Sequence, residues 1–225
     1  MTEQEWLTAI NPTRMLEYLR GKTSDRKLRL FAVACCRHLW HLMTEERCRN
    51  AVEVAERLAD GLATNVERRT AALAGYDPSM GEHPACFGAA GCAVGVPAFH
   101  AAERSSENAA GLAANKVPYL LHGNIVNPAW QEAIRREGVV QISLIAEIFG
   151  NPFRSVAFDP AWRTSDALLL ARGIYEERAF DGMPILADAL QDAGCDSDDI
   201  LGHLRDASAT HVRGCWALDL VLGKE

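Results

Sequence analysis

The sequence predicts an all-α fold, an irregular bundle of about eight or nine helices joined by long connectors rich in glycine and proline. No stretch shows the sustained alternation of β-branched and polar residues that marks a half-buried strand. Five of the nine prolines follow Asn or Asp, and such a pair is typical of a helix start. The Asx side chain accepts a hydrogen bond from the first turn, and proline tolerates the first helical position. The pairs are Asn11-Pro12, Asp77-Pro78, Asn127-Pro128, Asn151-Pro152 and Asp159-Pro160.

The N-terminal part is expected to form three helices. The first spans 12–21, and the second begins at Ser24 or Asp25 and runs to Met43. The third, over 44–62, is the most regular, because its apolar residues follow the i, i+3, i+4, i+7 spacing of an amphipathic helix. These residues are Cys48, Ala51, Val52, Ala55, Leu58, Ala59 and Leu62.

Two connectors interrupt the rest of the chain. The segment 75–97 is rich in Gly, Pro, Ala and Cys, and 151–163 is a second extended stretch. We interpret the chain as a single helical domain over 1–225, with 1–76 and 98–225 as its alternative subdivision. The remaining helices are expected at 98–115, 128–149, 164–177, 184–194, from Ser197 onward, and at 212–222.

Composition favours a cytoplasmic protein that contacts neither membranes nor nucleic acids. Hydrophobic residues make up 48% of the chain and charged residues 24%, as in ordinary globular proteins. The apolar run 28–36 is far shorter than the roughly 20 residues of a membrane span, and no basic signal region precedes it. The chain has seven cysteines, an odd number that cannot all pair in disulfides, so we expect reduced thiols. A net charge of −7 disfavours a surface that binds the phosphate backbone of nucleic acids.

Five strings carry a family resemblance: DRKLRLFAVACCRHLWHLM, IFGNPFR, DPAWRT, YEERAFDGMPILADALQDAGCDSDDILGHLR and HVRGCWALDLVLGKE. They resemble a paralogous family of uncharacterised bacterial proteins of planctomycetal type. The segment 184–194 is also similar to a short helical segment that accompanies leucine-rich repeats in such proteomes. The family has no known activity, so the resemblance implies a helical, adaptor-like role and identifies no catalytic residue.

Two clusters hold metal-ligand residue types. In the first, Cys35, His38 and His41 lie three apart on a predicted helix, next to Cys36 and with Cys48 further on. This spacing matches no closed zinc module, so we favour core packing there. The second cluster lies in the segment 83–107, where a loop runs into a helix. Its candidate ligands are His83, Cys86, Cys92, His100, Glu103 and Glu107, with zinc as the metal considered and a glycine-rich packing loop as the alternative.

No motif predicts an enzyme. Gly88, Gly91 and Gly95 form GxxGxxxG, but neither a preceding strand nor a following Lys-Ser/Thr supports a phosphate loop. There is no GxSxG elbow, and the pair Ser105-Ser106 has no identifiable base. Whether the chain is an enzyme stays open, and a non-catalytic role is preferred.

Charge is unevenly distributed along the chain. The segment 14–37 holds seven basic residues against two acidic ones, and 176–206 holds nine acidic against two basic. We interpret them as complementary surfaces for a protein partner or for self-association, with two solvated faces as the alternative. The resulting hypothesis is a protein–protein interaction or scaffold protein. The alternative is a metal-binding protein or metal-dependent enzyme that uses 83–107. The basic residues are Arg14, Arg20, Lys22, Arg26, Lys27, Arg29 and Arg37, and the acidic residues include Glu176, Glu177, Asp181, Asp188 and Asp206.

Overall fold

A computed structural model describes residues 1–74, 93–95, 97–114, 120–121 and 125–224. These residues are helical except for connectors and one antiparallel pair of two-residue strands, β1 (Leu120–Leu121) and β2 (Ile125–Val126). The all-α prediction is confirmed. The described residues contain eleven α-helices rather than eight or nine, because the short α1 (Glu3–Leu7) and α5 (Asn65–Ala74) were not predicted. None of the helices in this part of the chain combines the length and apolar character of a membrane span.

The chain forms two compact units, Glu3–Ile145 and Ala146–Glu225. The boundary lies inside α8 (Pro128–Phe149), whereas the subdivision considered from the sequence lies at the first connector. That first connector, 75–97, lies almost entirely outside the described residues. The second connector contains a turn after Asn151 and a short 3₁₀ helix, η2 (Pro160–Trp162).

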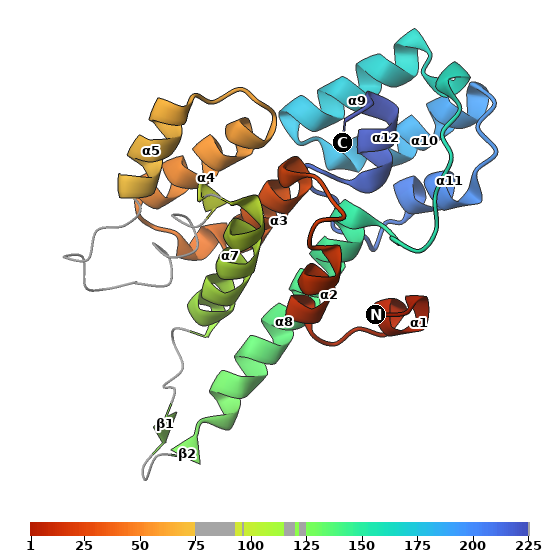
Figure 1. The fold of residues 1–225 in the computed structure, drawn as a ribbon. Coiled ribbons are helices and arrows are strands. Elements are labelled where there is room, and N and C mark those ends of the chain that lie inside the picture. Colours follow the sequence, from red (N-terminus) through yellow and green to blue (C-terminus); the bar gives the residue numbers. More distant parts are fainter. Residues whose placement is uncertain (75–92, 96, 115–119, 122–124, 225) are drawn as a thin grey trace. The chain divides into compact units, whose positions relative to one another are not determined.

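The first unit is built around α3, whose residues from Leu28 to Cys36 are all buried. It packs against α4 and α7, as Figure 1 shows. Ser24 caps α3 by accepting a hydrogen bond from the Lys27 amide, and Asn11 caps α2 in the same way. The elements of this unit not yet located are α2 (Pro12–Leu19), α3 (Asp25–His38), η1 (Trp40–Leu42), α4 (Glu46–Ala59) and α7 (Ala98–Ala113).

Two predicted helices of this unit are shorter than expected. α3 ends at His38 and is followed by η1, and α4 ends at Ala59. Gly61 has a φ of +71°, a left-handed conformation that stops a helix. Leu62 therefore lies outside α4 with 71% of its surface exposed, and Leu58 is only half-buried. The predicted apolar face is thus correct for its first three turns and wrong at its end.

Much of the basic segment 14–37 is used inside the first unit. Arg29 is buried, and its Nη1 donates to the carbonyl oxygens of Ala93 and Gly95, both at 2.9 Å. Arg26 pairs with Asp60 at 3.0 Å, and Arg37 pairs with Glu56 at 2.8 Å. These arginines join α3 to its neighbours, which reduces the basic surface that the sequence predicted.

The second unit packs α9, α10, α11 and α12 around one hydrophobic core. Thr164 and Ser197 cap α9 and α11, as the sequence predicted. α12 begins at Trp216 rather than at residue 212, because Gly214 has a φ of +92° that no helix accepts. The bounds are α9 (Ser165–Glu177), η3 (Phe180–Gly182), α10 (Met183–Asp192), α11 (Asp198–Arg205) and α12 (Trp216–Leu222).

Two arginines close the C-terminal ends of helices in this unit. Arg163 donates through Nε to the Val221 carbonyl at 3.0 Å and through Nη2 to the Leu220 carbonyl at 2.8 Å. Arg213 donates to the carbonyls of Tyr175 and Glu176, at 2.9 and 2.8 Å. The last carbonyls of a helix have no partner within it, so each guanidinium satisfies groups of α12 or α9.

Candidate metal centre

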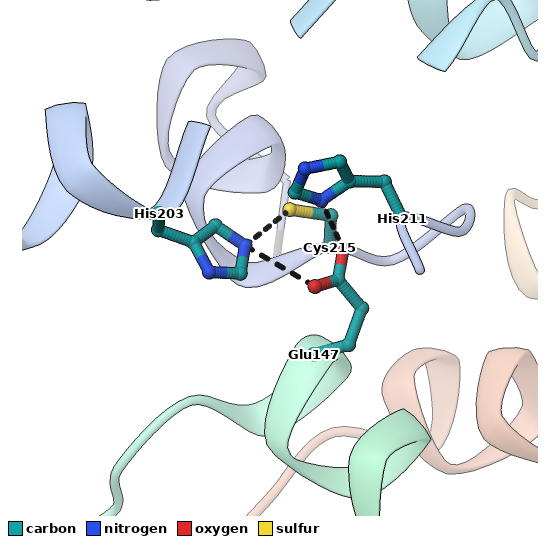
Figure 2. A group of neighbouring side chains, drawn as sticks. All are labelled: Glu147, His203, His211 and Cys215. Atoms are coloured by element: carbon teal, nitrogen blue, oxygen red, sulfur yellow. Dashed lines mark hydrogen bonds and ion pairs between the residues drawn. The ribbon is translucent and has the colours of Figure 1, made fainter. Parts of the chain in front are cut away.

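Four side chains of metal-ligand type converge in the second unit (Figure 2). Glu147 belongs to the last turn of α8, and His203 to α11. His211 lies in the loop that follows α11, and Cys215 is the N-cap residue of α12. Their ligand atoms all lie within 4.8 Å of one another. Three separate helices and one loop therefore meet at a single cluster of nitrogen, sulfur and oxygen atoms.

The contacts within the cluster are short. The Nε2 atom of His203 lies 3.2 Å from Cys215 Sγ and 3.2 Å from Glu147 Oε2. The Nδ1 atom of His211 lies 3.0 Å from Glu147 Oε1. The two imidazole rings pack edge to face, with 5.1 Å between their centroids. One ring nitrogen of His203 thus faces both the sulfur and the carboxylate.

The cluster is largely removed from solvent. The side chains of Glu147, His211 and His203 are 5%, 7% and 18% exposed, and Cys215 is fully buried. Burial acts to raise the pKa of Glu147, but the hydrogen bonds from the two histidines prevail, and that pKa lies below its usual value. Burial and the nearby Glu147 charge raise the pKa of the Cys215 thiol well above its usual value. Without a metal, therefore, the carboxyl group is ionised and the thiol protonated.

The surrounding backbone brings Glu147 to the cluster. α8 ends at Phe149, and the next residue, Gly150, has a left-handed φ of +63° and donates its amide to the Ala146 carbonyl at 2.9 Å. A Cβ atom at Gly150 would lie 3.3 Å from Cγ of Trp216. The Trp216 ring in turn packs on the His203 ring, with 4.9 Å between centroids. A glycine at this turn lets the end of α8 approach α12 closely enough for Glu147 to reach the histidines.

The loop that carries His211 is anchored at both sides. The Asp206 carboxylate accepts from the Ser208 amide at 2.9 Å, which fixes the start of the loop. Arg213 ties its end to α9 through the two carbonyl contacts described above. His211 is therefore held by its neighbours on both sides and not only by its contact with Glu147.

The donor set suits a zinc ion better than thiol catalysis. Zn²⁺ is bound by thiolate, imidazole and carboxylate ligands, almost always four of them in structural sites. A catalytic Cys–His–carboxylate triad instead uses two different ring nitrogens and an accessible thiol of lowered pKa. In this cluster the same nitrogen of His203 faces both Cys215 and Glu147, and the thiol is buried with a raised pKa.

The candidate ligands named from the sequence are not among these four residues. His83, Cys86 and Cys92 fall outside the described residues. His100 and Glu103 form a pair on the surface of α7, with 3.5 Å between Nδ1 and Oε2. In the described part of the chain, the group at Glu147 is the one set of three or more ligand-type residues close enough to share an ion.

The cysteines of the first cluster considered from the sequence, Cys35, Cys36 and Cys48, belong to the hydrophobic core. Cys35, Cys36 and Cys48 are buried, as expected for cysteines that pack as small hydrophobic residues. The Nε2 atom of His38 lies 3.7 Å from Glu137 Oε2 on α8, and His38 belongs to no group of three or more ligand-type residues in the described part of the chain.

Sequence reasoning missed the four ligands of the new cluster. The available signal was the spacing His-x3-Cys at His211 and Cys215, with His203 a short distance before it. The terminal helix predicted over 212–222 makes Cys215 an ordinary helix position and begins one residue after His211. Glu147 comes from a distant helix, and no local pattern marks it as a partner of the histidines.

The chain matches no protein-family model, and comparisons with curated proteins and with solved structures find no match. The fold and the cluster define this chain as an all-α protein with a candidate metal centre in its C-terminal unit. The resemblance to a planctomycetal-type family stays a prediction.

Proposed function

We propose that this chain is a zinc-binding protein in which Glu147, His203, His211 and Cys215 together hold one Zn²⁺ ion. The observation that carries the proposal is the convergence of four ligand atoms within 4.8 Å. Four protein ligands complete a tetrahedral shell, which is typical of a structural site rather than a catalytic one. The ion would join the end of α8, α11 and the start of α12.

A structural ion suits the chemistry of the cluster. The Glu147 carboxylate is buried with two histidines and the Cys215 thiol as its partners, and that thiol lies in the hydrophobic core of the unit. A divalent cation would compensate the buried carboxylate and stabilise the thiolate form of the cysteine. Because ligands far apart in the sequence are brought together only by folding, the binding free energy would add to the stability of this unit.

Metal analysis of protein purified without a histidine tag tests the proposal. We expect nearly one equivalent of zinc, lost in Cys215→Ser and in His203→Ala. Cys195→Ser is the matched control, because Cys195 is another buried cysteine of the same unit. His100→Ala controls for a general effect of removing a histidine, and it also tests the candidate cluster 83–107. Zinc retained in Cys215→Ser and lost in His100→Ala would overturn the assignment.

Cobalt substitution adds a spectroscopic test. A Co²⁺ ion bound to a thiolate shows a sulfur-to-metal charge-transfer band in the near ultraviolet. We expect this band in the wild-type protein and in Cys195→Ser, and its loss in Cys215→Ser. A band that persists in Cys215→Ser would place the metal on another cysteine.

A second candidate function is protein–protein interaction, the role expected from the sequence. It is favoured by exposed apolar side chains on and just before α5: Leu62, Val66 and Leu73 are 71%, 74% and 76% exposed. Val66 and Leu73 are seven residues apart and share one helix face. Large exposed apolar groups on one face are typical of a contact site. Interaction through the segments 14–37 and 176–206 stays a prediction, as does the cytoplasmic location.

The double variant Val66→Glu/Leu73→Glu tests this second function. If α5 mediates self-association, the wild-type mass measured by light scattering rises with concentration and the variant stays monomeric. Leu169→Glu is the control, since Leu169 is equally exposed but lies on α9 of the other unit. A monomeric wild type that also enriches no partner relative to the variant would count against an interface on α5.

A further inference from the structure

The first unit contains a cavity of about 500 Å³, independent of the metal centre. Its wall is mostly apolar, with Leu39 and Leu42 on one side and Ala133 and Val140 of α8 on another. Its polar lining includes the Glu137 carboxyl group and the His38 imidazole. A cavity of this size with an apolar wall and a few polar groups is typical of a small-molecule site.

Glu137 is only 3% exposed, and hydrogen bonds orient its carboxyl group. Gln141 donates through Nε2 to Glu137 Oε1 at 3.2 Å. Gln141 is itself fixed by Ser106 on α7, because its Nε2 donates to the Ser106 carbonyl at 3.0 Å and its Oε1 accepts from the Ser106 hydroxyl. A chain of buried polar groups thus orients one carboxyl group of α8.

The other oxygen of Glu137 has a different environment. Its Oε2 lies 3.7 Å from His38 Nε2, which is too long for a hydrogen bond. The cations nearest along α8, Arg135 and Arg136, bind Glu132 instead, at 2.7 Å in each case. The buried carboxyl group therefore has one amide donor and no close protein cation among the described residues.

We propose that this cavity binds a small organic amine, whose ammonium group lies at Glu137 Oε2 and His38 Nε2 and whose apolar part contacts the leucine and valine side chains. A cationic ligand would provide the counter-charge that the buried carboxylate lacks. A free anion is disfavoured, because Glu137 and Glu132 both line the cavity. A metal ion is disfavoured, because the described residues offer no third ligand within reach of Glu137 and His38.

The electrostatics of the cavity agree with this ligand class. Burial raises the pKa of Glu137 to about 7, and burial together with the nearby His41 lowers the pKa of His38. His38 is therefore neutral at physiological pH, and its free ring nitrogen can accept a hydrogen bond from an ammonium group. The other titratable groups near Glu137 are Cys35 of α3, His41 of η1, and Glu132 and Arg136 of α8, while α7 contributes the uncharged Ala113 to the lining.

Benzylamine serves as the probe, with benzyl alcohol as its neutral counterpart, in calorimetric titrations of the full chain at about pH 8. We expect benzylamine to bind with one equivalent and benzyl alcohol at least roughly tenfold more weakly. Glu137→Gln should weaken benzylamine binding by roughly tenfold to a hundredfold. Glu53→Gln is the control and should bind as the wild type does, because Glu53 is an exposed residue of α4 that does not line the cavity.

A measurement on the wild-type protein avoids dependence on a variant. Carbon-13 NMR of labelled glutamate follows the titration of Glu137, and saturating benzylamine should lower its pKa, because the ammonium group favours the ionised carboxylate. The proposal is overturned if benzylamine does not bind, if the alcohol binds equally well, or if the Glu137 titration is unchanged. None of these outcomes depends on whether the second unit binds zinc.

Discussion

Two buried glutamates on the same helix have opposite pKa shifts. Glu137 receives one amide hydrogen bond, so burial prevails and its pKa rises to about 7. Glu147 receives contacts from His203 and His211, and its pKa falls below the usual value although it is also buried. The number and charge of the partners, and not the residue type, decide which protonation state is stable. The first arrangement suits a cationic ligand, and the second suits a metal.

The raised pKa of Glu137 makes stability depend on pH in a defined direction. The unfolded chain loses this proton near the usual glutamate pKa of 4.5, and the folded chain retains it until about pH 7. Between these values the unfolded state binds fewer protons, so the free energy of unfolding falls as pH rises, by up to about 3 kcal/mol. Glu137→Gln removes this term. We expect urea denaturation to show the variant gaining stability relative to the wild type between about pH 5 and about pH 8.

Glu132→Gln is the control for this pH effect, since Glu132 is exposed and paired with two arginines. If the free energy of unfolding differs between Glu137→Gln and the wild type by the same amount at both pH values, Glu137 ionises normally in the folded protein.

Gly150 is the residue at which the backbone and the candidate metal centre meet. Gly150→Ala introduces a left-handed alanine and brings Cβ to 3.3 Å from the Trp216 ring. We expect a loss of roughly 1–3 kcal/mol in thermal or urea unfolding. Gly194→Ala is the matched control, because Gly194 has a φ of +93° but open space around the added Cβ. Equal losses in the two variants would show that the contact with Trp216 contributes nothing.

At the level of elements, α12 illustrates how a short helix is kept in place. Seven residues are too few for a stable isolated helix, so α12 depends on the burial of Leu218 and Val221 and on its ends. Arg163 provides the hydrogen bonds at its C-terminal end. We expect Arg163→Ala to destabilise the protein by roughly 1–3 kcal/mol in urea unfolding, because two carbonyls lose a charged donor.

Arg172→Ala is the comparison for this variant, since Arg172 is exposed on α9 and loses no such contact. If both substitutions lower the free energy of unfolding equally, the hydrogen bonds of the Arg163 guanidinium do not stabilise the end of α12.

Elements with clear caps and periodicity were predictable from the sequence. The start and end of α8 and the capped starts of α9 and α11 lie where Asx-Pro, threonine and serine signals indicated. α1 and α5 were missed because each buries only one residue, Trp6 in α1 and Ala71 in α5, so neither has a clear apolar face. The end of α4 was wrong because the conformation of Gly61 overrides an apolar pattern that continues to Leu62.

The candidate metal centre could not be predicted in the same way. Its four ligands come from α8, α11, a loop and α12, and each is locally unremarkable as a helix or loop residue. Tertiary packing alone places them together, through Gly150, Trp216 and Arg213. By contrast, the candidate ligands of the segment 83–107 were close in sequence, which made them visible without showing whether they meet in space.

At the scale of the whole molecule, the two units differ in what stabilises them. The first unit is built around the buried helix α3 and its arginine contacts. All four candidate ligands belong to the second unit, Ala146–Glu225. Ligand binding stabilises only the structure that contains the site, so zinc removal should act on one unit and leave the other unchanged.

Hydrogen exchange measured by mass spectrometry on the full chain tests this separation. At a free zinc concentration one hundred times the dissociation constant, binding contributes about 2.7 kcal/mol, which corresponds to roughly a hundredfold slower exchange through opening of the second unit. We therefore expect a chelator to speed exchange in α11 and α12 by up to about this factor, with α3 and α4 unaffected. Cys215→Ser should show the fast pattern without chelator and no further response to it. Faster exchange in both units alike, or in neither, would contradict a metal centre confined to the second unit.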